Sequence, residues 1–455
     1  MRFPAALVSV ACLLVFSVGV NANSQQGPPP AMRALFDALT SAANSGSAEA
    51  WEVFAQQRFA PELLADQTPA QRAEIYRRMV DAFGTIAIGG VTREGPQAPL
   101  RMNIKGSKGG GVIVLEVADD PVRIRSIEVR TGAAAIEAPV AGAPLPALDR
   151  TLTSDEINRR LDGYFTKLAA DDVFSGVAMV AKNGVPVFFK AYGLANREKK
   201  IPNTIRTRFN IGSINKEFTQ NAIRQLVREG KLAMTDTLGS FFPDYPQAVS
   251  RAATIEQLLT HRAGLADFFG AEFNRAPKDG FTSNADYFKF VSSRPPSFAP
   301  GERNQYCNGC YIALGEIIAK VSGMSYEDYV AKHVFGRAEM TSTGYPRSDQ
   351  PADDIAIGYT RRGGGTLQPN TAMHGVTGSA AGGGYSTALD MLTYVKAVRA
   401  GRFPGHGGDV GIAGGAPGTN AILESRGEWT VIVLTNLDPP TGERLGVAIA
   451  NALER

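Results

Sequence analysis

Cysteine is scarce in this sequence, and neither sign of charge is in excess. Three cysteines among 455 residues are too few for the disulfide scaffold that stabilises small secreted domains. Lysine and arginine together number 47, aspartate and glutamate together number 44, and the basic residues do not cluster into runs. The composition therefore gives no indication of nucleic-acid binding or of a polybasic membrane anchor.

Long hydrophobic runs are also lacking beyond the N-terminus. Arg2 precedes a nearly apolar stretch over residues 5–20, and residues 20–22 (Val-Asn-Ala) can serve as a cleavage site. This stretch is shorter than the roughly 20 residues that span a bilayer, although an uncleaved anchor is the alternative. We predict a signal peptide over residues 1–22, and hence a periplasmic or secreted mature protein with no membrane span.

Glycine and proline, 49 and 27 residues, are too few for a disordered or collagen-like chain. At roughly 100–200 residues per domain, the length predicts two to four domains. Apolar residues recur at helical spacing over 31–83 and at alternate positions over 86–130. This change of period predicts a small α+β accessory domain over residues 31–132. Its order of elements faintly resembles the nuclear transport factor-like cone.

An alanine- and proline-rich stretch over residues 133–150 has linker composition, and a second domain over 151–455 follows it. Thr153 and Glu156 have the spacing of a capping box, which opens a helix. A strand hairpin is predicted over 175–192 and a second strand pair over 420–436. Strands at both ends with helices between them indicate one sheet built from the two ends of the domain, in an α/β sandwich.

Ser213 and Lys216 lie three residues apart at the start of a predicted helix and share one face of its first turn. A serine hydroxyl becomes a nucleophile when a neighbouring group accepts its proton, and a lysine removed from water has a pKa low enough to do so. The helix start also offers backbone N–H groups to an oxyanion. Alone, Ser-x-x-Lys occurs by chance about once in such a chain, and then marks only a solvated lysine.

Further segments around this pair occur in a fixed order along the chain. They are Phe209–Gly212, Glu229–Leu232, Ile255–His261 with Gly264 and Leu265, Tyr306–Asn308 with Tyr311 and Gly315, His333–Thr341, and Gly382–Thr387. Together they resemble the serine β-lactamase-related family, which includes class C β-lactamases, penicillin-binding carboxypeptidases and esterases. The resemblance covers residues 150–455 and implies a β-lactamase/transpeptidase-like fold, an antiparallel sheet packed with helices.

The resemblance also implies roles for four side chains. Ser213 would be the nucleophile that forms an acyl-enzyme, and Lys216 the base that receives its proton. Tyr306 would share this proton relay and pass a proton to the leaving group. Asn308 would hold the lysine and a substrate amide, because a carboxamide both donates and accepts hydrogen bonds. Without the Ser-x-x-Lys pair, Tyr306 would be an aromatic packing residue and Asn308 an N-cap. No metal or organic cofactor is required.

The family's third motif, Lys-Thr-Gly or His-x-Gly on a strand beside the serine, has two candidate positions. His406-Gly407-Gly408 matches by residue type. Residues 412–414 (Ile-Ala-Gly) match by their distance from the following Ala416-Pro417-Gly418, and we prefer this second placement. It puts Gly414 and the N–H of Gly415 beside the oxyanion, but it lacks the usual lysine or histidine. His406 would then be an ordinary loop histidine.

Removal of the signal peptide would remove Cys12 and leave Cys307 and Cys310, which bracket Asn308. A thioredoxin-like redox pair would need a βαβ context that is not apparent here. A zinc site would need further ligands close in sequence. A short-loop disulfide formed on export is the preferred prediction, and two free buried thiols are the alternative.

We therefore predict an exported serine hydrolase, an esterase or D-amino-acid peptidase, whose partner is a small-molecule or peptide acyl substrate such as a cell-wall fragment. Two departures from the family pattern weigh against turnover. Gly415 follows Thr387 by only 28 residues, a shortened stretch, and His-x-Ser-Gly is replaced by residues 261–264 (His-Arg-Ala-Gly). The alternatives are a catalytically silent module that binds a peptide or glycan, and a true β-lactamase, which the altered third motif makes less favoured.

Overall fold

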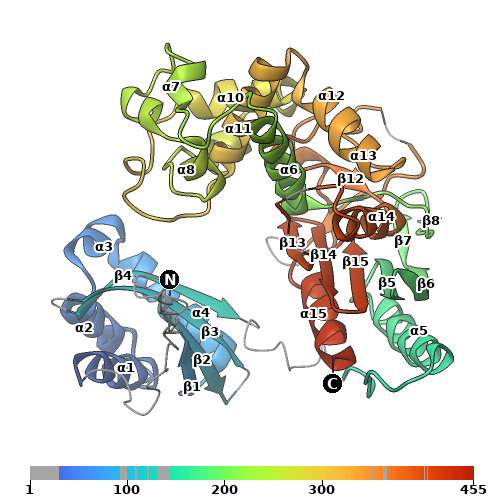
Figure 1. Cartoon of the computed structure of the whole chain (residues 1–455). Helices are drawn as coiled ribbons and strands as arrows, with labels where there is room; N and C mark the ends of the chain where they lie inside the picture. The colour runs from blue at the N-terminus through green and yellow to red at the C-terminus, as the bar shows by residue number, and fades with distance from the viewer. Residues whose placement is uncertain are drawn as a thin grey trace, which may run out of the picture. The chain divides into compact units, whose positions relative to one another are not determined.

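The computed structural model divides into two compact units, Met1–Ala135 and Ile136–Arg455, which are coloured along the chain in Figure 1. The predicted signal peptide with Cys12, and most of the predicted linker, lie outside the residues that the structure describes. The described residues are 30–92, 100–107, 110–119, 122–131, 144–350, 352–361, 366–403, 405–406 and 408–454.

The first unit consists of four helices followed by a four-stranded antiparallel sheet of order β1-β2-β3-β4. Capping by Ser47 and Thr68, and prolines at the first turns, start three of the helices. The helix-then-strand order agrees with the predicted change of period, whereas the cone resemblance stays a prediction. The elements are α1 (Pro30–Ala43), α2 (Ala48–Arg58), α3 (Pro61–Asp66), α4 (Pro69–Phe83), β1 (Ile86–Thr92), β2 (Leu100–Gly106), β3 (Gly110–Asp119) and β4 (Val122–Thr131).

The second unit is built on a five-stranded antiparallel sheet of order β13-β14-β15-β5-β6. Its strands come from both ends of the unit, which confirms the predicted assembly, and Thr435 of β15 pairs with Gly176 of β5. The turn between β5 and β6 uses Asn183 and Gly184 with positive φ, as a tight hairpin requires. The strands are β5 (Gly176–Lys182), β6 (Val185–Tyr192), β13 (Val410–Ala416), β14 (Thr419–Arg426) and β15 (Trp429–Thr435).

Both faces of this sheet are buried, and its central strands β5 and β15 are mostly apolar. On one face, Val180 and Val433 pack with α5 (Ser154–Ala170) and α15 (Thr441–Leu453). On the other, Met179 and Leu434 pack with α6 (Asn215–Arg228), α11 (Asn308–Ser322) and α14 (Ala388–Arg399). Figure 1 shows α15 and α5 beside the sheet and a group of helices beyond α6.

The remaining elements are short and carry the loops around α6 and α11. Among the described residues, no helix is both long enough and apolar enough to cross a bilayer. The other helices are α7 (Leu238–Phe241), α8 (Ile255–Leu259), α9 (Ala271–Arg275), α10 (Asn284–Ser292), α12 (Tyr326–Val330) and α13 (Gly336–Ala338); the other strands are β7 (Leu194–Asn196), β8 (Ile201–Pro202), β9 (Phe209–Asn210), β10 (Tyr359–Thr360), β11 (Gln368–Pro369) and β12 (Tyr385–Ser386).

Gly315 allows α11 to lie close to the segment around Ala380. A Cβ atom at position 315 would lie 2.6 Å from both the Cβ of Ala380 and the Nδ2 of Asn284. Asn284 joins the two parts, since its Nδ2 donates to the carbonyl oxygen of Ile312 at 3.0 Å and its Oδ1 accepts from the N–H of Ala380 at 2.9 Å. The absence of a side chain at Gly315 therefore fixes the distance between α11 and this segment.

We predict that Gly315→Ala destabilises the protein by about 1–3 kcal/mol, because the new methyl group overpacks a closed contact. Gly163→Ala is the matched control. It also lies inside a helix, α5, but its Cβ would meet no atom within 4 Å, so it should stabilise the protein by about 0.5–1 kcal/mol. Urea denaturation of both variants measures the two changes, and equal signs would contradict the packing argument.

Candidate active site

Ser213 and Lys216 are presented by a tight turn at the start of α6. Gly212 has φ +52°, and a Cβ atom there would lie 2.8 Å from the backbone nitrogen of Gly415. Gly414 is equally constrained, since its Cβ would lie 2.7 Å from the nitrogen of Ser213. Glycine at these positions lets the edge strand β13 approach the serine at backbone distance.

The side chain of Lys216 is buried and meets three acceptors. Its Nζ lies 3.2 Å from Oγ of Ser213 and 2.8 Å from Oδ1 of Asn308, and it also bonds the carbonyl oxygen of Ala381. Burial lowers its pKa to about 7, and the charge of Asp267 opposes this shift. A neutral amine keeps two N–H donors and one lone pair, so it can bond Asn308 and Ala381 and accept from the serine hydroxyl.

Three residues of α6 bond the backbone of residues 379–381, the segment that contains the carbonyl group of Ala381. Asn215 donates to the carbonyl oxygen of Ser379 at 2.9 Å, and Thr219 donates to that of Ala380 at 2.7 Å. Lys216 itself takes the next carbonyl, that of Ala381. This backbone acceptor was missed in the sequence, because a carbonyl group has no side-chain signature; the neighbouring segment Gly382–Thr387 was noted only as part of the family resemblance.

Tyr306 completes the contacts of the serine. Its hydroxyl donates to Oγ of Ser213 at 2.6 Å, and its ring lies over Nζ of Lys216 at 4.8 Å. Desolvation raises the pKa of Tyr306, and the nearby charge of Asp267 raises it further. The phenol is therefore protonated at neutral pH, in contrast to the lysine.

His261 fixes the position of Tyr306. The two rings stack with centroids 4.8 Å apart, and Nδ1 of His261 accepts from the N–H of Cys307 at 3.2 Å. Burial and the charge of Lys216 lower the pKa of His261 to about 4. The imidazole is thus neutral, and we describe it as a positioning residue.

Asn308 is hydrogen-bonded to Asp267, a residue that the sequence analysis did not predict at the site. Nδ2 of Asn308 donates to Oδ2 of Asp267 at 2.8 Å, while the N–H of Phe269 donates to Oδ1 of Asp267 at 3.0 Å. One N–H of the amide is therefore used inside the protein. Asp267 was missed, although it closely follows the motif around Gly264.

Cys307 and Cys310 are joined as a disulfide at the start of α11, with Cα atoms 5.3 Å apart. Sγ of Cys307 caps the helix, accepting from the N–H of Cys310 at 3.0 Å. The bond encloses Asn308 and adjoins Tyr306, so it constrains the two residues that contact Ser213 and Lys216 from this side.

The two placements of the third motif differ in the structure. Gly414 and Gly415 on β13 lie beside Ser213, and Nδ2 of Asn420 donates to the carbonyl oxygen of Gly414 at 3.2 Å. His406 instead bonds Glu217, with Nε2 and Oε1 2.5 Å apart. His406 precedes β13 and is not among the residues that line the cavity beside Ser213, so the geometry favours the placement at Gly414 and Gly415.

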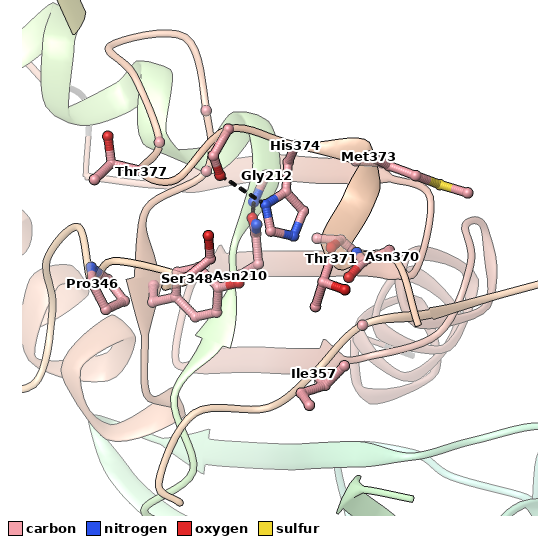
Figure 2. Close-up of a pocket in the computed structure, with 18 of the residues that line it drawn as sticks. Asn210, Gly212, Pro346, Ser348, Ile357, Asn370, Thr371, Met373, His374 and Thr377 are labelled. Atoms are coloured by element: carbon pink, nitrogen blue, oxygen red, sulfur yellow. Dashed lines mark hydrogen bonds between the residues drawn. The ribbon is translucent and has the colours of Figure 1, made fainter. Parts of the chain in front are cut away.

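A cavity of about 170 Å³ opens beside Ser213 and Asn308. Figure 2 shows two chain segments around it, labelled between Pro346 and Ile357 and between Asn370 and Thr377. Among the described residues, no cluster of histidine, cysteine or acidic side chains has the arrangement of a metal site.

Comparisons with known proteins agree with this geometry. The family model described as Beta-lactamase matches residues 161–408, more than half of the chain. The chain belongs to the beta-lactamase family. This assignment confirms the resemblance on which the sequence predictions rested.

One sequence relative and two solved structures illustrate the similarity. The protein PbpX of Bacillus subtilis (strain 168) is 30% identical over 245 residues, which are 53% of this chain and 58% of PbpX. A penicillin-binding protein of Bacillus halodurans superposes with TM-score 0.57 at 28% identity, over 63% of this chain and 99% of that one. A class C beta-lactamase superposes with TM-score 0.53 at 19% identity, over 67% and 98%. The chain spans about half the length of the curated relatives that it matches.

We predict that Lys216 makes the stability of the fold depend on pH. An unfolded lysine binds its proton up to about pH 10.5 and the folded one releases it above about 7, so the unfolded chain binds more protons between these values. The free energy of unfolding should therefore rise with pH across this window, by up to about 1.4 kcal/mol per pH unit.

Replacement of the lysine tests this dependence. Lys216→Met should flatten the rise between pH 7 and 10, whereas Lys167→Met, at an exposed side chain on α5, should keep it. Urea denaturation at several pH values measures the slopes, and an unchanged slope in Lys216→Met would show that the lysine stays charged when buried.

Proposed function

We propose that this protein is an exported serine hydrolase that acts through an acyl-enzyme on Ser213. The observation that carries the proposal is the shared contact at Oγ of Ser213, which lies within hydrogen-bond distance of both Nζ of Lys216 and the hydroxyl of Tyr306. A solvated lysine at a helix start would have neither burial nor such partners.

The opposite pKa shifts of Lys216 and Tyr306 support different roles for the two side chains. Lys216, with its pKa lowered to about 7, is available as a neutral base at neutral pH. Tyr306, with its pKa raised, keeps its proton and acts as a relay. Lys216 therefore suits proton removal from the serine, and Tyr306 suits proton delivery.

In acylation, Nζ of Lys216 takes the proton of the Ser213 hydroxyl as Oγ bonds to the substrate carbonyl carbon, and the carbonyl π pair moves to the oxygen. The intermediate collapses by breaking the bond to the leaving group. That group receives the hydroxyl proton of Tyr306, and the Lys216 ammonium returns a proton to Tyr306. In deacylation, water gives a proton to the neutral lysine and attacks the ester, and Ser213 leaves with that proton.

The oxyanion of each intermediate requires N–H donors at a fixed position. The backbone nitrogens of Ser213 and Gly415 are suitable, because Gly212 and Gly414 bring the α6 turn and β13 into close approach. We assign Gly414 and Gly415 to substrate binding on this basis, with Asn308 offering its remaining N–H to the substrate. His406 has no part in this proposal.

An esterase or D-amino-acid peptidase activity fits these residues better than a β-lactamase activity. Ile412 stands where the family has its usual lysine or histidine, so the β-lactam carboxylate has no cation at that position. The alternative of a silent binding module is less favoured, because Ser213, Lys216, Tyr306 and Asn308 are all present and in contact. The acyl substrate is a small molecule or peptide, with cell-wall fragments as one class.

We also propose an extracytoplasmic location and a division of labour between domains. A structural disulfide such as Cys307–Cys310 persists in oxidising compartments, which supports export by the predicted signal peptide. Residues 151–455 contain every proposed site residue and form the hydrolase domain. Residues 31–132 form an accessory domain, joined by the linker over 133–150.

Active-site labelling tests the proposal. A fluorophosphonate should form an adduct at Ser213, located by mass spectrometry of the purified protein, and Ser213→Ala should abolish it. Ser348→Ala, a serine that also lines the cavity, should keep the adduct. Absence of an adduct in the parent protein would overturn the catalytic proposal. A comparison of the rates of hydrolysis of p-nitrophenyl esters and of nitrocefin, a β-lactam, would distinguish an esterase from a β-lactamase.

A second prediction concerns the charge of Asp267. If neutral Lys216 is the base, kcat/KM should rise with pH through about 7. Asp267→Asn removes a negative charge that favours the ammonium, so the rising limb should move to lower pH by about half a unit or more.

Asp155→Asn, an exposed site on α5, should leave the pH at which kcat/KM rises unchanged. A purely structural role of Asp267 would instead lower kcat/KM at every pH without moving the limb. The pH profile of ester hydrolysis distinguishes these outcomes.

A further inference from the structure

The cavity beside Ser213 has a composition that indicates the substrate class, provided that the proposed hydrolase function holds. One wall is aromatic. Phe268 and Phe269 lie with ring centroids 4.2 Å apart, and Phe268 also contacts Phe273 at 5.1 Å and Tyr287 at 5.2 Å. All four side chains line the cavity.

The facing segments add aliphatic side chains. Ile355, Ile357, Met373 and Val376 line the same cavity, and Figure 2 shows Ile357 and Met373 beside it. Phe269 and Met373 are 49% and 39% exposed. Large apolar side chains left exposed at a cavity mouth are typical of ligand sites.

Positive charge in this cavity is already paired among the described residues. Arg347 binds Asp349 through two hydrogen bonds of 2.9 and 2.7 Å, and Nζ of Lys199 lies 3.9 Å from Asp353. His374 is the remaining basic side chain of the lining. Burial lowers its pKa, and its Nδ1 lies 3.1 Å from the carbonyl oxygen of Gly375, so it is neutral at pH 7.

The volume sets the size of the group that fits. A cavity of about 150 Å³ with apolar walls holds a benzene molecule, and the cavity here measures about 170 Å³. A ring or a chain of about six carbons therefore fills it, whereas an acetyl group leaves most of the apolar wall uncovered.

We propose that this cavity binds an uncharged, apolar acyl group of about six carbons, so that neutral esters or amides of medium-length or aryl-substituted acids are the preferred substrates. The aromatic wall of Phe268 and Phe269 and the side chain of Met373 bury the acyl group. Asp349 and Asp353 neutralise the charges of Arg347 and Lys199, which disfavours a second carboxylate.

Three esters test the proposal on the full-length protein. p-Nitrophenyl hexanoate and the p-nitrophenyl monoester of adipic acid both carry six-carbon acyl groups and differ by a terminal carboxylate; p-nitrophenyl acetate is the short reference. We expect kcat/KM for the hexanoate to exceed both others by about tenfold or more. Over the acetate, the reason is that a few buried methylene groups contribute on this order; over the adipate monoester, it is that the apolar wall leaves a carboxylate unpaired.

The outcomes separate the substrate class from the underlying chemistry. Preference for the adipate monoester or the acetate, with fluorophosphonate labelling of Ser213 intact, would overturn the substrate class alone. Hydrolysis of none of the three esters together with no adduct at Ser213 would overturn both proposals. Labelling without hydrolysis of any ester would overturn the substrate class and leave Ser213 as the nucleophile.

Substitutions of the exposed lining residues Phe269 and Met373 test whether these side chains bind the acyl group. Phe269→Ala and Met373→Ala should each lower the ratio of hexanoate to acetate kcat/KM by about fivefold, mainly through KM. Leu389→Ala removes an equally exposed apolar side chain on α14 outside the cavity and should keep the ratio. An unchanged ratio in both wall variants would overturn the assignment of this wall to the acyl group.

Discussion

The arrangement of the second unit depends on keeping the amino group of Lys216 out of water. Burial of an ammonium group is costly unless its donors are satisfied or its proton is released. Three separate parts of the chain meet this requirement: the turn before α6 with Ser213, the start of α11 with Asn308, and the segment that ends at Ala381. The contacts that hold these three parts together therefore also keep the hydrogen-bond partners of Lys216 Nζ in position.

The environment of that nitrogen separates two groups whose unperturbed pKa values are nearly equal. Lysine and tyrosine both titrate near pH 10 in water, yet burial moves them in opposite directions because it disfavours the charged form of each. Asp267 lies near both and raises both values. A lysine with a lowered pKa and a tyrosine with a raised pKa thus lie side by side at Ser213.

Sequence patterns predicted the side chains that meet at this site but not the groups that hold them. Ser213, Lys216, Tyr306 and Asn308 carry recognisable spacing, and the two-ended sheet followed from the placement of the strand pairs. The carbonyl group of Ala381 has no residue signature, and Asp267 contacts Asn308 from 41 positions away. His406 matched a motif by residue type, but its place before β13 directs it to Glu217. Spacing along one helix is readable, whereas contacts between distant segments depend on the packed fold.

The two-ended sheet also has a consequence for how the chain reaches its native state. Thr435 donates to the carbonyl oxygen of Ser175, 260 residues earlier, and β13, which borders Ser213, belongs to the last strands made. A chain that emerges from its N-terminus cannot close this sheet until nearly all of it is available, and such non-local pairing is slow. Ser213 is therefore made about 200 residues before β13, the strand that lies beside it, and its native surroundings form only after that strand has been synthesised.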